Sequence, residues 1–224
     1  MNRLLAGCEI LLVAFFGQFL ASLIWLLLIS SENPLKSSAS IFAFQMIDSI
    51  ITLAAIACLL RLKGQAWQTI GWRRKGTAKG ILAGIAALPL LFGTALLIVS
   101  AVSRLLPELA SDSNPLLELI QTRQDVLLFS ASSLLVGGFK EEIQRAFIVE
   151  SFESGLGGVW VGLAAWSLLF GLLHLAQGPD RAIAASFLGL IFGLLYLWHR
   201  QLAAPICAHG LYDLAVVLLT WWGR

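Results

Sequence analysis

The sequence predicts an all-α protein, a polytopic bundle of about seven transmembrane helices, with six and eight as the bounds. Of its 224 residues, 58% are hydrophobic and 12% are charged, against about 25% charged in an ordinary soluble domain. The mean hydropathy is +0.86. A chain this apolar lacks the polar surface to coat a water-soluble globule, whereas a bilayer accommodates apolar helix surface.

Seven apolar stretches are long enough, or nearly so, to cross a bilayer, which takes about 20 mainly apolar residues. The fourth stretch contains polar residues, and the fifth and sixth are short. We divide the single membrane domain into N-terminal helices (1–125) and a C-terminal helical core (126–224). The predicted helices are residues 4–29, 41–62, 80–102, 126–149, 159–175, 182–198 and 202–222.

The distribution of charge predicts an orientation. The loop at residues 61–79 holds six basic residues and no acidic residue, so the positive-inside rule places it in the cytoplasm. With seven helices, the N-terminus is then cytoplasmic and the C-terminus lies outside. We expect a multi-pass protein of a bacterial cytoplasmic membrane. The net charge of +2 gives no indication of a nucleic-acid partner.

Three polar clusters interrupt the apolar helices. An ionisable group at the bilayer centre costs at least ~2.5–3.5 kcal/mol, so such a group usually marks function. Residues four apart share a face of a helix, which groups the members of each cluster. The clusters are Lys140-Glu141-Glu142-Ile-Gln144-Arg145, Phe170 with His174, and His209 with Asp213.

Antiparallel helices of these lengths bring the clusters to a similar depth, so we expect Glu141, His174, His209 and Asp213 to converge. If the turn between the fourth and fifth helices is cytoplasmic, the site lies toward the inner leaflet. A carboxylate partly removed from water can act as a general base toward a bound water.

The remaining polar residues suit supporting roles. Two imidazoles can stabilise an oxyanion or bind a metal, and Asp213 could orient His209 or join the binding site. Arg145 could pair with Glu141 or Glu142. Lys140 is expected to snorkel or to pair with Glu150 or Glu153, without a chemical role.

These three motifs, in this order, resemble the CAAX-protease and bacteriocin-processing (CPBP, or Abi) family of intramembrane proteases. The family pattern is a Glu-Glu pair followed by Arg, then FxxxH, then HxxxN or HxxxD, on separate helices. The resemblance covers roughly residues 126–222. The chain departs from the family's EExxxR in one place, because Ala146 stands where Arg is expected and Arg145 precedes it.

The resemblance implies an endopeptidase that acts on a membrane-associated peptide or protein. Glu141 would activate water, His174, His209 and Asp213 would position it or stabilise the oxyanion, and Glu142 with Arg145 would support them. The family is named a metalloprotease, and the four side chains Glu141, His174, His209 and Asp213 could hold zinc. A metal-free glutamate mechanism is equally compatible with these residues.

Two rival functions belong to other classes. A non-catalytic membrane scaffold or immunity protein could keep the same fold, and the shortened EExxR spacing favours it. A proton-coupled transporter also uses Glu, His and Asp within helices. However, the polar residues lie in one half of the chain and no inverted repeat is apparent. The sequence also lacks HExxH, GxSxG and GxGD motifs, which disfavours other membrane hydrolases.

Overall fold

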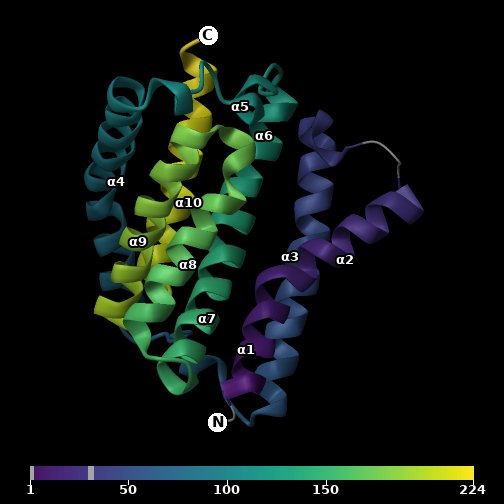
Figure 1. Ribbon diagram of the computed structural model, residues 1–224, viewed down its shortest axis with the longest axis vertical. Coiled ribbons are helices and arrows are strands. Elements are labelled where there is room, and N and C mark those ends of the chain that lie inside the picture. The colour runs from purple at the N-terminus through teal and green to yellow at the C-terminus, as the bar shows by residue number, and fades with distance from the viewer. Residues whose placement is uncertain (1–2, 30–32) are drawn as a thin grey trace.

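The computed structural model describes residues 3–29 and 33–224, and within these ranges the chain forms helices and loops without a strand (Figure 1). The all-α prediction is confirmed. The elements are α1 (Arg3–Leu11), η1 (Leu12–Phe16), α2 (Gly17–Ile24), η2 (Trp25–Ile29), η3 (Pro34–Lys36), α3 (Ser38–Leu62), η4 (Trp67–Ile70), α4 (Thr77–Leu105), η5 (Pro107–Leu109), α5 (Pro115–Glu118), α6 (Arg123–Ser132), η6 (Ser133–Glu141), α7 (Glu142–Gly155), α8 (Val159–Leu173), η7 (Leu175–Gln177), α9 (Pro179–His199) and α10 (Ala203–Trp222).

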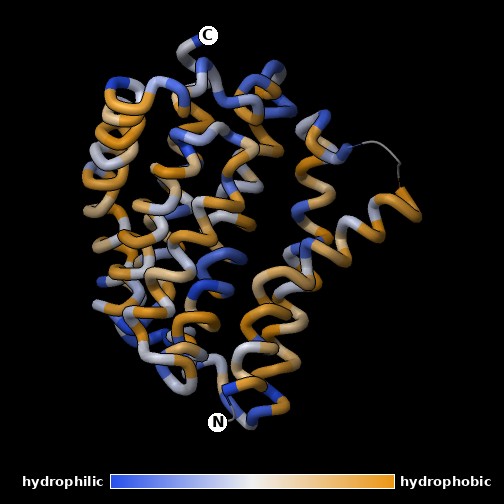
Figure 2. The backbone as a smooth tube through the Cα atoms, viewed as in Figure 1, coloured by the Kyte–Doolittle hydropathy of each residue, from blue (hydrophilic) through white to orange (hydrophobic). Residues whose placement is uncertain are grey.

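Each of the seven predicted stretches is helical. Within the described residues, five helices are long and apolar enough to cross a membrane. The predicted stretch 159–175 forms the shorter apolar helix α8. The stretch 126–149 is also helical but carries four charged residues in its second half. Figure 2 shows this hydrophilic part, where η6 meets α7, between the two hydrophilic ends of the molecule. The five spans are Arg3–Ile29, Ser38–Leu62, Thr77–Leu105, Pro179–His199 and Ala203–Trp222.

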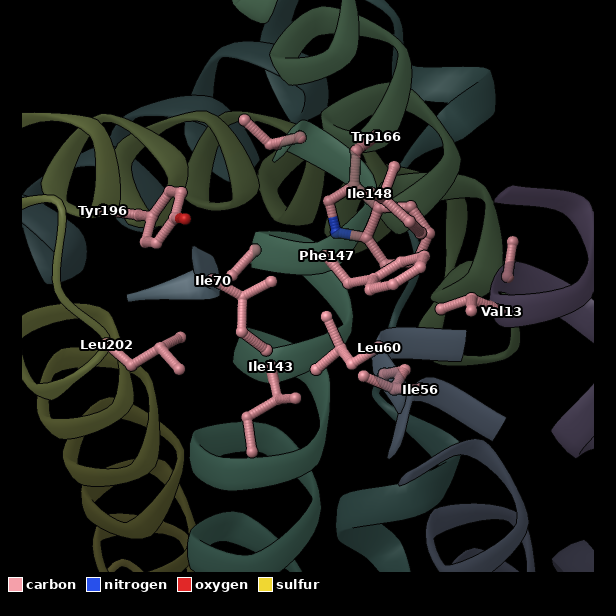
Figure 3. Packing of buried hydrophobic residues seen from close by; sticks show 13 residues of the cluster. Val13, Ile56, Leu60, Ile70, Ile143, Phe147, Ile148, Trp166, Tyr196 and Leu202 are labelled. Carbon is pink, nitrogen blue, oxygen red and sulfur yellow. The ribbon is translucent and has the colours of Figure 1, made fainter. Parts of the chain in front are cut away.

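The main bundle consists of α4, α8, α9, α10 and the helix formed by α6, η6 and α7. Within it, α10 packs against α4 and η6, and α8 packs against α9. The continuous helix formed by α1, η1, α2 and η2 pairs with α3 in a hairpin on one side of α7. The α2 end of this hairpin diverges from the bundle (Figure 1). A core cluster joins the hairpin to the bundle (Figure 3); its labelled members are Val13, Ile56, Leu60, Ile70, Ile143, Phe147, Ile148, Trp166, Tyr196 and Leu202.

Small residues allow the helices that carry the polar motifs to approach closely. A Cβ atom built on Gly138 would lie 3.0 Å from the Cα of Gly210, so η6 and α10 meet with their backbones in contact. Gly189 and Gly193 on α9 are spaced four residues apart, and a side chain on Gly193 would overlap Leu163 of α8. These contacts bring the second half of the chain into one tight unit.

Contacts at the two ends of the bundle show which loops lie together. At one end, Arg200 pairs with Glu153, and the backbone of Leu202 donates to the carbonyl of Gly71 in the basic loop. At the other end, the C-terminal Arg224 donates to the carbonyl of Leu117, close to α5. The basic loop, the α7–α8 turn and the α9–α10 turn therefore share one end, as the predicted topology requires.

Candidate active site

A π-helical segment leads directly into the acidic pair. The segment η6 spans Ser133–Glu141 and ends at Glu141, the first residue of the pair. π-helical turns within α-helices are frequently found at functional sites, since they alter the register of the side chains that follow. Of the two acidic partners that the sequence allowed for Arg145, the structure selects Glu142, three residues before it.

Glu142, Arg145 and His209 form a buried hydrogen-bonded network. Arg145 donates from Nε to Oε2 of Glu142 at 2.9 Å and from Nη2 to Oε1 at 3.1 Å. The Nδ1 atom of His209 lies 2.7 Å from the same Oε1. Both side chains of the Glu142–Arg145 pair are fully buried, at 0% exposure. A buried ion pair is tolerated only when its geometry is good and its other polar atoms are satisfied, and both conditions hold here.

The guanidinium of Arg145 has further partners on two other helices. Its Nη1 donates to the carbonyl of Gly189 on α9 at 3.0 Å. Its central carbon lies 4.7 Å from the ring centre of Phe170 and 5.7 Å from that of Phe192. A Cβ on Gly189 would lie 3.1 Å from the Phe170 ring and 3.4 Å from Nη1, so the glycine leaves room for both. Arg145 thereby connects α7, α8 and α9.

Two more carboxylates face the outer nitrogen of His209. Its Nε2 lies 3.3 Å from Oδ2 of Asp213, one turn later on α10, and 3.9 Å from Oε2 of Glu141. The imidazole stacks on Phe192 with the ring centres 4.3 Å apart. Because the ion-paired carboxylate of Glu142 accepts a hydrogen bond, Nδ1 of His209 carries the hydrogen. His209 is thus held in one orientation, with Nε2 directed at Glu141 and Asp213.

His174 ends α8, and its ring is fixed by the motif that contains it. Its Nδ1 lies 2.7 Å from the carbonyl oxygen of Phe170, and the two rings are 4.4 Å apart. Because a carbonyl oxygen can only accept, Nδ1 donates and Nε2 is left to meet water or substrate. The FxxxH spacing therefore sets both the orientation and the tautomer of His174.

The four predicted site residues line a single cavity of about 570 Å³. The side chain of Glu141 is 22% exposed and that of Asp213 is 35% exposed, whereas His209 is 3% exposed. Gly137 keeps this region open, because a Cβ there would lie 2.5 Å from Oδ2 of Asp213. The cavity also carries apolar side chains; among them are Phe92, Ala95, Leu96, Val99, Ala184, Leu188 and Val216.

The opposite face of the same helix is attached to the N-terminal hairpin. Lys140 pairs with Asp48 of α3 at 2.8 Å, so the expected pairing with Glu150 or Glu153 and the expected snorkelling are both wrong. Gln144 donates at 2.7 Å to the carbonyl of Val13, within the π-helical segment η1. Lys140 is 7% exposed and Gln144 is 4% exposed. Two buried polar contacts therefore hold the hairpin against the helix that presents Glu141.

The side chains of the site match the chemistry of a zinc ion but not its geometry. Imidazole and carboxylate groups are suitable zinc ligands. The Nδ1 atom of each imidazole is hydrogen-bonded to an oxygen, which is the usual arrangement for a histidine that binds a metal through Nε2. However, no three His, Cys, Asp or Glu side chains of residues 3–29 and 33–224 are arranged so that they could hold one ion. The chemistry proposed for this site therefore rests on its side chains.

Some features of the site lie beyond what the sequence indicated. The spacing of one helical turn indicated Asp213 as a possible partner of His209, but the shorter contact is with Glu142 on another helix. Phe192, which stacks on His209, had no motif to mark it. One signal in the sequence could have indicated it. Phe192 lies three residues after Gly189, on the same face of the helix, and a glycine within a helix often marks a close approach to another element.

Comparison with known proteins bears on the same region. Residues 123–215 match the family model described as type II CAAX prenyl endopeptidase Rce1-like. No curated protein and no solved structure matches the chain. The matched segment begins at α6 and ends two residues after Asp213, so it includes all three polar motifs. It confirms the resemblance to the CPBP and CAAX-protease family.

Proposed function

We propose that this chain, whose residues 123–215 match the Rce1-like type II CAAX prenyl endopeptidases, is an endopeptidase that uses Glu141 to activate water within the membrane. The observation that carries the proposal is the contrast between two adjacent carboxylates. Glu142 is fully buried and paired, whereas Glu141 is partly exposed, lines the cavity and faces Nε2 of His209.

The distance between Glu141 and His209 suits a shared water molecule. The 3.9 Å between Oε2 and Nε2 is longer than a direct hydrogen bond, and one water can bridge groups at such a distance. Glu141 would accept a proton from this water as the oxygen attacks the carbonyl carbon of the substrate. General bases of this kind contribute roughly 10²- to 10⁴-fold to the rate.

The two histidines would assist the attack and the collapse of the intermediate. When protonated, His209 can donate from Nδ1 to Glu142 and from Nε2 to Asp213 or to the developing oxyanion. His174 offers Nε2 to the same cavity. The proton taken by Glu141 would pass to the leaving amine, so that the products are a carboxylate and an amine. Glu142 and Arg145 would keep His209 in place.

A proteolysis assay with purified protein in liposomes tests the proposal, with membrane-anchored peptides as substrates. We expect Glu141→Gln to lower kcat at least about 100-fold and His174→Ala to lower it as well, with unchanged thermal unfolding. Glu153→Gln is the matched control, because it makes the same chemical change at the end of the bundle, where Glu153 pairs with Arg200.

Cleavage that survives both Glu141→Gln and His174→Ala would exclude this mechanism. Biological activity retained in both variants without cleavage would instead favour a scaffold or immunity protein, and proton flux sensitive to them would favour transport. The same assay tests for zinc dependence separately. Loss of cleavage on chelation, restored by added zinc, would establish it, and unchanged cleavage would support the metal-free mechanism.

A further inference from the structure

The polar residues of the cavity fall into two groups. The first contains Glu141 and the residues around it. The second lies toward the end of the bundle that carries the C-terminus, and it contains Asn114, Gln177 and Arg181. Asn114 and Gln177 are hydrogen-bonded to each other at 3.3 Å, which connects the segment before α5 to the α8–α9 turn. Among the described residues that line the cavity, Arg181 is the single arginine or lysine.

One nitrogen of the Arg181 guanidinium makes all the described contacts that hold this side chain in place. Nη1 donates to both carboxylate oxygens of Asp180, at 3.1 and 3.2 Å, and to the carbonyl of Ser111 at 3.3 Å. Asp180 itself is 1% exposed, whereas the Arg181 side chain is 25% exposed. Every described side-chain contact of Arg181 thus uses Nη1. The remaining N–H groups of the planar fork are suited to bind a further carboxylate.

The distance between Arg181 and Glu141 along the bundle matches the length of a short extended peptide. Arg145 lies between the levels of two glycines of α9, because its Nη1 donates to the carbonyl of Gly189 and its Cδ lies 3.8 Å from the Cβ position of Gly193. In the parallel helices α7 and α9, with a rise of ~1.5 Å per residue, Glu141 lies ~6 Å above Arg145, and Arg181 lies ~12 Å above Gly189 and ~18 Å above Gly193. Arg181 is therefore ~6–12 Å beyond Glu141 along the bundle, which corresponds to roughly two to four residues of extended peptide at ~3.3 Å each.

We infer that Arg181 is a specificity-determining residue that binds a carboxylate of the peptide substrate, roughly two to four residues from the scissile bond. This inference rests on the proposed endopeptidase function. The carboxylate is either the C-terminal one of a peptide that ends within the cavity or that of an acidic side chain. The first substrate would be trimmed near its C-terminus, and the second would be cut internally.

The test uses three peptides of otherwise identical sequence. One has a free C-terminal carboxylate, the second has a C-terminal amide, and the third has the amide and an added Asp three residues after the scissile bond. We expect the wild type to prefer one of the charged peptides over the uncharged amide by roughly 10- to 100-fold in kcat/KM, mainly through KM. The preferred charged peptide identifies the source of the carboxylate.

Arg181→Gln should abolish this preference, so that the three peptides are cleaved with similar kcat/KM. Arg181→Lys should retain part of it, since lysine keeps the charge but loses the planar fork. Arg123→Gln, at the exposed start of α6, is the control. A wild type without preference, or an Arg181→Gln variant that loses cleavage of all three peptides equally, would overturn the assignment.

A binding measurement separates this inference from the proposed function. The Glu141→Gln variant would be titrated with the same three peptides, each carrying a fluorescent label. A charged peptide that binds more tightly in an Arg181-dependent manner supports the carboxylate site even if the wild type cleaves none of them. Equal binding of all three peptides, with and without Arg181, would refute it.

Discussion

At the scale of single residues, two adjacent glutamates differ in their environments, one buried and one open to the cavity. Glu142 has both carboxylate oxygens occupied by Arg145 and His209, whereas Glu141 faces the cavity. The sequence predicted a functional acidic pair because charges in an apolar helix are costly. It could not assign the partners, since the π-helical turns before Glu141 alter which residues share a face.

This contrast predicts different effects of the same substitution at the two positions. Glu142→Gln leaves the fully buried Arg145 without its ionic partner, so we expect it to lower the free energy of unfolding by about 3–5 kcal/mol. Glu141→Gln should leave stability nearly unchanged. Thermal unfolding in detergent measures both, with the exposed Glu108→Gln as the control. Equal stability of Glu142→Gln and Glu108→Gln would contradict the structural role of the network.

At the scale of elements, the contact between the N-terminal hairpin and the helix that presents Glu141 depends on residues far apart in the sequence. Lys140 meets Asp48 and Gln144 meets Val13. Sequence reasoning found partners for Lys140 only among nearby acidic residues on its own helix. It missed Asp48 because no local spacing connects α3 to η6, and only the packed bundle brings the two together.

The Lys140–Asp48 pair predicts a compensating double variant. Lys140→Met leaves a largely buried carboxylate unpaired, and we expect a loss of about 3 kcal/mol in stability together with lower kcat, because the hairpin supports the helix that presents Glu141. Combining Lys140→Met with Asp48→Leu removes both charges and should restore most of the stability. Double-mutant thermal unfolding and cleavage rates test this. Additive losses in the double variant would show that the pair does not act as a unit.

Asp125, just before the predicted fourth span, connects the starts of α6 and α3 and predicts a pH dependence. A hydrogen bond from Ser38, with further bonds from Thr122 and Gln121, lowers its pKa from 3.8 to about 2. Because the folded-state pKa is the lower one, the stabilisation is present above pH 4 and disappears as the pH falls toward 2.

The difference in melting temperature between wild type and Asp125→Asn should thus be constant from pH 7 to 5 and vanish near pH 2. Asp112→Asn, at an exposed position, should show no such change. A difference that persists at pH 2 would contradict the assignment.

At the scale of the whole molecule, apolar length predicted the helices well, because the bilayer requires spans of about 20 residues whatever their partners. The polar motifs also indicated which helices meet around the cavity. The extent of the cavity could not be predicted in the same way. It depends on small residues such as Gly137 and on the segment around Asn114 that lines its far end.

The charge distribution also predicts which side of the membrane the far end of the cavity faces. His209 lies on the second turn of α10, near the end of the bundle that holds the basic loop, but the cavity extends from there toward Arg181 at the opposite end. If the basic loop is cytoplasmic, Arg181 faces the outside. In a variant without the three native cysteines, Asp112→Cys should react with a membrane-impermeant thiol reagent in intact cells, and Lys75→Cys only after permeabilisation. The reverse pattern would place the carboxylate-binding end in the cytoplasm, and substrates would then have to enter from that side.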